Sequence, residues 1–162
     1  MRRAYELTDG SGTAAVSARS EWILIDPAER KILRPGDFKG KPLNSRAKDV
    51  DCPECRKITL PGEGREALGL RPVRWSDLDG NGHVYSGNYG DIVWDFLPAD
   101  LQAAPLRELY VNYSKEAVLG DTMALFGFRE EHAYTMEGRL GETLGFSCRC
   151  EFGERSEEHT SE

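Results

Sequence analysis

Three polar residues at alternate positions, Asp79, Asn81 and His83, are the residues best suited to chemistry. They supply a carboxylate, an amide and an imidazole, which can move protons or hold an oxyanion. A helix-like run, residues 88–97, follows, so backbone N–H groups of its first turn should lie nearby. The spacing favours chemistry on a carbonyl, although the intervening glycines are also typical of a plain turn. Asp77 adds a carboxylate, but the further oxygen ligands of a calcium loop are missing.

Hydrophobic periodicity predicts the elements that must position these residues. Residues 72–75 read as a strand that leads into the polar segment, and apolar residues in the helix-like run recur at intervals of three and four. Four extended runs follow the helix: residues 109–118, 122–128, 132–138 and 143–152. One helix followed by four antiparallel strands predicts an α+β fold in which a sheet curls around the helix.

The N-terminal part of the chain is organised differently. Residues 4–7 and 14–25 read as two strands joined by a turn, because an Asp-Gly pair between extended segments is typical of a hairpin. Residues 37–70 are rich in glycine, proline and charged residues, and they read as a linker. Such a long connection is unusual inside one domain, so it favours two units.

Composition and charge exclude several classes of protein. The chain has 162 residues, 39% hydrophobic residues and a formal net charge of −7. An acidic chain without a dense basic cluster is a poor nucleic-acid binder. No run is long and apolar enough to cross a membrane, and no signal-peptide core follows the N-terminus, so we expect a cytoplasmic protein without membrane contact.

The four cysteines form two close pairs, Cys52 with Cys55 and Cys148 with Cys150. The first pair is half of a zinc-knuckle pattern, and the second pair could supply the other half. However, alternate residues of a strand share one face, so the second pair also fits a strand whose thiols simply point the same way. We predict free thiols and no cofactor, with structural zinc as the alternative.

The sequence also resembles a known enzyme family. Residues 75–84, residues 109–117 and the pair Gly120 and Asp121 are together similar to the acyl-acyl carrier protein thioesterases, which release fatty acids in plants and bacteria. The early segment 18–26 resembles the same family. The resemblance implies two tandem hot-dog domains, each an antiparallel sheet wrapped around a central helix.

This resemblance implies a fragment with four parts. Residues 1–36 would be a remnant of the first hot-dog domain, residues 37–70 the interdomain linker, and residues 71–154 a nearly complete second hot-dog domain. Residues 155–162 resemble a translated sequencing adapter, so we expect an artefactual, disordered tail and leave His159 out of any functional argument.

The resemblance also implies roles for individual residues. Asp79, Asn81, His83 and Glu116 correspond to the family's proposed catalytic positions. Glu116, late in a predicted strand, would act as the base for water through Asp79, while Asn81 and His83 would position that water or the thioester carbonyl. Some members carry a cysteine where this chain has Ala117, so attack by water is expected rather than covalent catalysis.

The expected substrate is a fatty acyl thioester, with the acyl chain in an apolar tunnel beside the helix. We expect the tunnel to be lined by Tyr89, Ile92, Val93 and Val111. Tyr85 and Ser86 replace an Asn pair of the family, which leaves Ser86 as a candidate helix cap. Two other functions stay open: a non-catalytic acyl-binding or scaffold fragment, and an acyl-CoA thioesterase that works as a homodimer.

The expected protein partner is acyl carrier protein, which is itself acidic. Since this chain is also acidic, the encounter requires a local basic patch. The candidate cations for that patch are Arg71, Arg74, Arg107 and Lys115.

Overall fold

The computed structural model describes residues 2–26, 28–29, 31–37 and 50–153. The chain divides into two compact units, Met1–Arg56 and Lys57–Glu162, and each is described by itself. Among the described helices, none is long and apolar enough to cross a membrane.

The first unit contains the predicted hairpin. Strand β1 (Arg2–Thr8) pairs antiparallel with β2 (Ala14–Glu21). The turn is held by the Asp9 carboxylate, which accepts the backbone N–H of Ser11 at 2.8 Å. The prediction that the second strand reaches residue 25 is wrong, because the chain leaves the ladder after Glu21 and turns back on itself through an isolated bridge between Ile25 and Ile32.

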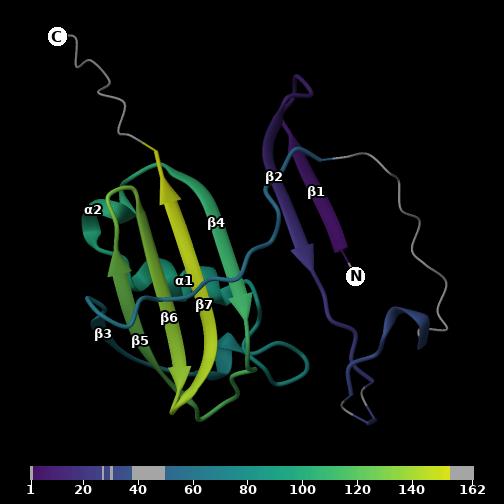
Figure 1. Cartoon of the computed structure of the whole chain (residues 1–162), viewed down its shortest axis with the longest axis vertical. Helices are drawn as coiled ribbons and strands as arrows, with labels where there is room; N and C mark the ends of the chain where they lie inside the picture. The colour runs from purple at the N-terminus through teal and green to yellow at the C-terminus, as the bar shows by residue number, and fades with distance from the viewer. Residues whose placement is uncertain (1, 27, 30, 38–49, 154–162) are drawn as a thin grey trace. The chain divides into compact units, whose positions relative to one another are not determined.

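The second unit is a five-stranded sheet with a helix across one face (Figure 1). The sheet order is β3-β5-β6-β7-β4, and all neighbours are antiparallel. The strands are β3 (Glu66–Pro72), β4 (Leu106–Tyr113), β5 (Thr122–Arg129), β6 (Ala133–Leu140) and β7 (Thr143–Phe152). The helices are α1 (Asn88–Phe96) and the single turn α2 (Ala99–Gln102).

The main core lies between α1 and the sheet. Tyr89, Ile92 and Val93 of α1 are at most 4% exposed and pack on side chains from the inner face of the strands. These include Met123 and Leu125 of β5, Tyr134 and Met136 of β6, and Phe146, Cys148, Cys150 and Phe152 of β7. The helix contains Gly90 and is short, so burial of this apolar face, rather than intrinsic propensity, must hold it.

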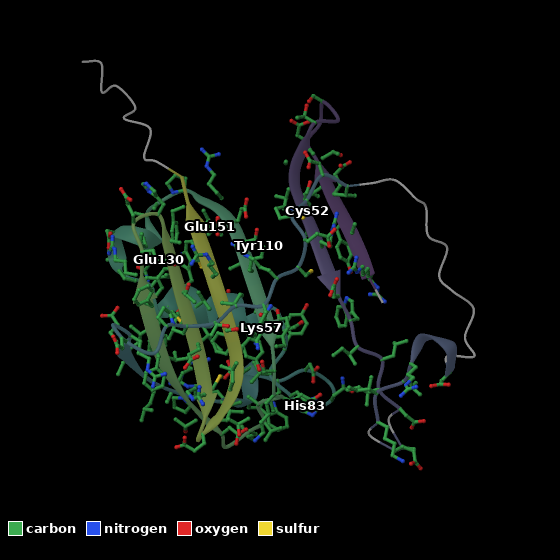
Figure 2. All side chains as sticks on the ribbon, viewed as in Figure 1. Cys52, Lys57, His83, Tyr110, Glu130 and Glu151 are labelled. Carbon is green, nitrogen blue, oxygen red and sulfur yellow. The ribbon has the colours of Figure 1, made fainter. Side chains whose placement is uncertain are left out.

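The outer face of the same sheet is also covered. The extended segment that begins at Lys57 crosses β7 and β6 on the side away from α1 (Figures 1 and 2). Ile58 is buried, its N–H donates to the Asn112 side chain at 2.8 Å, and its carbonyl accepts the Ser147 hydroxyl at 3.4 Å. Because both faces are covered, β6 is buried along most of its length.

The structure corrects two strand boundaries. The strand expected at residues 72–75 is β3, which runs instead from Glu66 to Pro72 and lies mostly inside the predicted linker. Its pattern was hidden because Gly69, with φ of 137°, produces a bulge against β5. β4 ends at Tyr113, before the predicted residue 118.

The remaining elements of the second unit confirm the predictions closely. Helix α1 and strands β5, β6 and β7 lie within two residues of the expected bounds. The middle of the predicted linker, residues 38–49, and the tail 155–162 lie outside the described residues. The assignment of 1–36 and 71–154 to two hot-dog copies stays a prediction.

Ile58 offers a test of the covering segment. We expect Ile58→Ala to lower the free energy of unfolding by about 2 kcal/mol or more, because it removes a buried side chain from the sheet's outer face. Leu70→Ala, at a side chain that is 69% exposed, is the control and should cost less than about 0.5 kcal/mol. Urea unfolding measures both, and equal losses would contradict the described packing.

Candidate functional site

Residues 79–83 form a tight turn organised by the Asp79 carboxylate. The Asp79 N–H donates to the His83 carbonyl at 2.8 Å, and Asp79 Oδ1 accepts the N–H groups of Asn81 at 2.8 Å and His83 at 3.2 Å. Gly82 has φ of 81°, a conformation that favours glycine. The Asn81 N–H holds the pKa of the Asp79 carboxyl below its usual value. Asp79 therefore stays ionised and shapes the turn.

A second loop is joined to this turn by backbone contacts. The Val84 N–H donates to the Ala117 carbonyl at 2.8 Å, and His83 forms an isolated bridge with Val118. Asp121 closes the loop, because its carboxylate accepts the Val118 N–H at 3.0 Å. These contacts place the residue just before Ala117 beside the imidazole.

That residue is Glu116, and its Oε2 lies 3.3 Å from Nε2 of His83. The His83 side chain is 31% exposed and the Glu116 side chain is 57% exposed, so water can reach the pair. His83 lies at the opposite end of the sheet from Glu130 and Glu151 (Figure 2). The pair unites a carboxylate with an imidazole at a solvent-accessible position, which is an arrangement suited to proton transfer.

Glu116 does not lie in a strand, which corrects the prediction. β4 ends at Tyr113, and the N–H groups of Ser114 and Lys115 both donate to the Gly145 carbonyl, at 2.8 and 3.0 Å. Two donors on one carbonyl break the regular ladder, and the chain turns out of the sheet. Glu116 therefore sits on the loop that meets the turn, rather than across the sheet.

Asp77, close to the candidate site in sequence, is buried, which its turn-like sequence context concealed. Its carboxylate accepts both Nη atoms of Arg71, at 3.0 and 2.7 Å, and the Arg74 N–H at 2.6 Å. These donors already occupy the carboxylate oxygen atoms that a cation loop with Asp79 would need. The Arg71 guanidinium holds the pKa of this carboxyl below its usual value. The only signal in the sequence was an arginine six positions before the acid.

The start of α1 is held through Asn88 and not through a side-chain cap. Gly87 occupies the N-cap position without a side-chain hydrogen bond, so the expectation that Ser86 caps the helix is wrong. The Asn88 amide reaches back and donates to the Asp77 carbonyl at 3.1 Å. The Ser86 carbonyl instead accepts the hydroxyl of Tyr113 at 3.0 Å.

The four residues expected to line an acyl tunnel lie in or against the core. Tyr89, Ile92 and Val93 are buried between α1 and the sheet, and Val111 packs against them from β4. The Tyr89 ring makes edge contacts with Tyr113 and Phe146 at centroid distances of 5.3 and 5.0 Å. Burial raises the pKa of the Tyr89 phenol, so it stays protonated. Their role in acyl binding stays a prediction.

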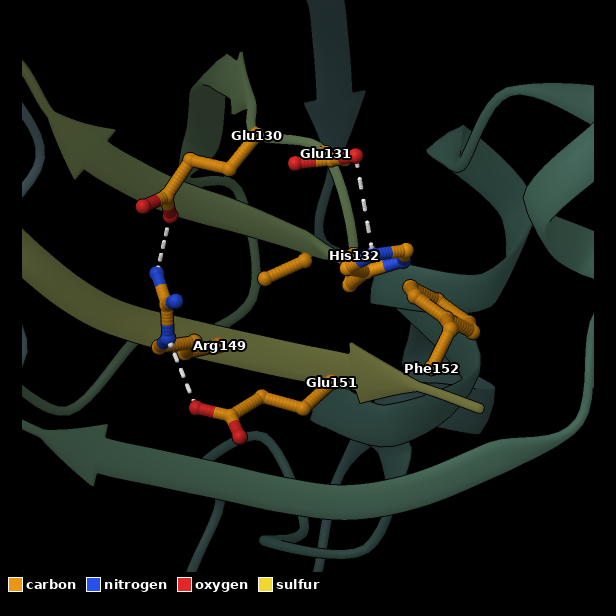
Figure 3. Close-up of a pocket in the computed structure, with 7 residues that line it drawn as sticks. Glu130, Glu131, His132, Arg149, Glu151 and Phe152 are labelled. Carbon is orange, nitrogen blue, oxygen red and sulfur yellow. Dashed lines mark hydrogen bonds and ion pairs between the residues drawn. The ribbon is translucent and has the colours of Figure 1, made fainter. Parts of the chain in front are cut away.

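A hollow of about 360 Å³ lies at the end of the sheet away from His83 (Figure 3). It is lined by residues 130–133, Arg149, Glu151 and Phe152. Arg149 pairs with Glu130 and Glu151, and His132 lies 3.8 Å from Glu131. A polar lining of this kind does not suit an acyl chain.

The predicted basic patch is divided in the structure. Arg71 forms an ion pair with Asp77. Arg107 lies at the start of β4, at the opposite end of that strand from the loop that carries Glu116. Arg74 and Lys115 lie close in sequence to the two site segments and are the patch members that remain candidates.

The cysteine pairs lie in different units. Cys148 and Cys150 are buried under α1 with their sulfur atoms 3.9 Å apart, and the neighbouring thiol and burial raise the pKa of Cys148. Cys52 is partly exposed and Cys55 is exposed. In the part of the chain that the structure describes, no three histidine, cysteine or acidic side chains gather as metal ligands.

Comparisons with known proteins agree on one fold. A solved acyl-ACP thioesterase from Bacteroides thetaiotaomicron matches with a TM-score of 0.79 at 23% identity, covering 94% of this chain and 62% of that one. The 12:0-ACP thioesterase from Umbellularia californica matches with a TM-score of 0.64 at 17% identity, covering 94% and 60%. These matches, with the five-stranded sheet around α1, confirm the predicted hot-dog fold.

Sequence comparison leads to the same family. The chloroplastic palmitoyl-acyl carrier protein thioesterase of Arabidopsis thaliana is 27% identical over 124 residues, which are 72% of this chain and 30% of that protein. The chain therefore spans less than two thirds of each of these relatives. The family model described as the acyl-ACP thioesterase C-terminal domain matches residues 65–151, more than half of the chain and both members of the His83–Glu116 pair. The chain belongs to the acyl-ACP thioesterase family.

Proposed function

We propose that this chain hydrolyses the thioester of fatty acyl-acyl carrier protein and releases a free fatty acid. The observation that carries the proposal is the 3.3 Å contact between His83 and Glu116, on two segments that the family match covers. Acyl carrier protein as the partner, with Arg74 and Lys115 among its contacts, and a cytoplasmic location belong to the same proposal.

The proposed reaction uses water as the nucleophile. Glu116 accepts a proton from water, whose oxygen attacks the thioester carbonyl carbon, and His83 orients the Glu116 carboxylate through Nε2. The tetrahedral oxyanion is stabilised by a backbone N–H near the start of α1 and by Asn81. The carbon–sulfur bond then breaks, and the leaving thiolate takes up the proton held by Glu116.

Asp79 supports this reaction without acting as the base. Its Oδ1 accepts two backbone N–H groups and its pKa is lowered, so it is a weak proton acceptor at neutral pH. Its contribution is to fix the backbone of Asn81 and His83. Proton transfer from water therefore falls to Glu116, supported by His83.

A second candidate function is a non-catalytic acyl-binding or scaffold protein. The observation that favours a scaffold role is that Tyr89, Ile92 and Val93, which were expected to line the tunnel, are at most 4% exposed and pack in the core of the fold. The His83–Glu116 pair could then persist on a chain whose role is structural and without turnover. Thiol release from acyl-acyl carrier protein separates the two, since saturable fatty-acid binding without turnover would support only the scaffold function.

Glu116→Gln should lower kcat/KM by about 100-fold or more, because the amide cannot accept the proton from water. Glu142→Gln is the matched control, since Glu142 is an exposed glutamate at the β6–β7 turn. Thiol release with acyl-acyl carrier protein measures both variants. An active wild-type chain whose rate survives Glu116→Gln would remove Glu116 from its role.

The acyl group should never become attached to the protein. Ala117 offers a methyl group where a nucleophile would be needed, so mass spectrometry of the protein quenched during turnover should find no acyl adduct. Ser114→Ala removes the one hydroxyl side chain of the loop 114–121 and should leave the rate unchanged. An adduct on the wild-type chain that disappears in Ser114→Ala would contradict direct attack by water.

A further inference from the structure

We propose that the ion pair between Arg71 and Asp77 is a positioning device for the candidate site. By fixing the base of the hairpin 77–85, it determines where His83 meets Glu116. The inference deepens the proposed function and rests on it for its catalytic consequence. Its structural consequence, the order of the hairpin, can be measured without turnover.

The Asp77 carboxylate is held in direction as well as in place. Its side chain is 9% exposed, and both nitrogen atoms of the Arg71 fork donate to it from the end of β3. The Arg74 N–H adds a third bond at 2.6 Å. A bidentate guanidinium restricts a carboxylate more than a single donor does, and removal of one partner would leave a buried charge unpaired.

The backbone of Asp77 carries this constraint into the hairpin. Its carbonyl accepts the Tyr85 N–H at 2.8 Å and the Asn88 side chain at 3.1 Å. The next contact along the hairpin is the bridge between Leu78 and Val84. Asp77 therefore bonds to β3 through its side chain. Through its backbone carbonyl it closes the hairpin and holds Asn88, the first residue of α1.

The hairpin is short, so its base controls its tip. Above the Leu78–Val84 bridge, the Asp79 N–H donates to the His83 carbonyl, and the turn follows at once. No other described element lies between the Asp77–Tyr85 hydrogen bond and His83. A displacement of about 1 Å can cost a catalytic site up to about 100-fold in rate. Loss of the Arg71–Asp77 ion pair should therefore lower the rate by displacing His83 from Glu116.

The second unit offers a matched control for this ion pair. The side chain of Glu137 in β6 is 8% exposed, close to the 9% of Asp77, and it too is bonded by arginines: Arg65 at 3.4 Å and Arg139 at 3.2 Å. It lies on the outer face of the sheet, on a different element from the hairpin. Glu137→Gln therefore removes a buried charge of the same kind without touching the hairpin.

Acid should abolish the contribution of Asp77 to stability. Arg71, with Arg74 nearby, holds the folded-state pKa of this carboxyl below its unfolded value of about 3.9. A lowered pKa stabilises the fold above the unfolded value, and the gain is lost as pH falls through the folded value. We expect the difference in urea midpoint between wild type and Asp77→Asn to be full at pH 7 and to shrink below about pH 4. A constant difference would show that the charge does not contribute.

Amide hydrogen exchange by NMR, together with kcat and KM, tests the positioning role. In Asp77→Asn, the amides of Asp79, Val84 and Tyr85 should exchange at least about tenfold faster relative to the amides of β6, the factor for one lost charge-assisted hydrogen bond. kcat should fall by a similar factor while KM changes little. Glu137→Gln should leave kcat unchanged. Its hairpin amides should exchange no faster than its loss of global stability accounts for.

Arg71→Lys repeats the comparison if Asp77→Asn does not fold, since it keeps the charge and loses the fork. The inference would be overturned if the hairpin amides exchanged as slowly in Asp77→Asn as in Glu137→Gln. Equal losses of kcat in Asp77→Asn and Glu137→Gln would also overturn it. A wild-type chain without turnover would remove the proposed function, while the exchange rates would still decide whether Asp77 anchors the hairpin.

Discussion

The candidate site depends on one backbone junction, in which the Val84 N–H donates to the Ala117 carbonyl and His83 bridges Val118. These contacts join two loops that are far apart in the sequence and bring His83 and Glu116 within 3.3 Å. Side chains alone could not hold this geometry, because both members of the pair are partly exposed and an exposed ion pair contributes little stability. The backbone supplies the order that the pair needs.

The core beneath supports that junction. Ala117 is fully buried, and it packs in the same cluster as Val84 and Tyr89. Burial of these neighbours fixes both loops against the start of α1, while the polar side chains project toward solvent. Asp79 illustrates the division of labour, because a carboxylate that faces its own backbone shapes the turn and leaves proton transfer to Glu116.

Sequence patterns predicted much of this architecture, and the failures have identifiable physical causes. Helix α1 and strand β7 were found because their apolar periodicity is strong. β3 was missed in part because its bulge at Gly69 interrupts the alternation that marks a strand. The covering segment at Ile58 read as a linker, since a single strap across a sheet has no periodicity of its own.

The site residues divide in the same way. Asp79, Asn81 and His83 could be selected from residue type and spacing, and family resemblance added Glu116. Resemblance did not reveal that Glu116 pairs with His83, because that contact depends on backbone bonds between distant segments. The burial of Asp77 was equally out of reach, since a turn aspartate is ordinarily solvated and its partner lies on a strand that was wrongly bounded.

The central claim is that His83 and Glu116 act as one unit, and a double-mutant cycle tests it most directly. kcat/KM for thiol release would be measured for wild type, His83→Ala, Glu116→Gln and the double variant. Residues that act as a unit give strongly non-additive effects, so we expect the double variant to be about as slow as the slower single variant. Losses that simply add would contradict the account.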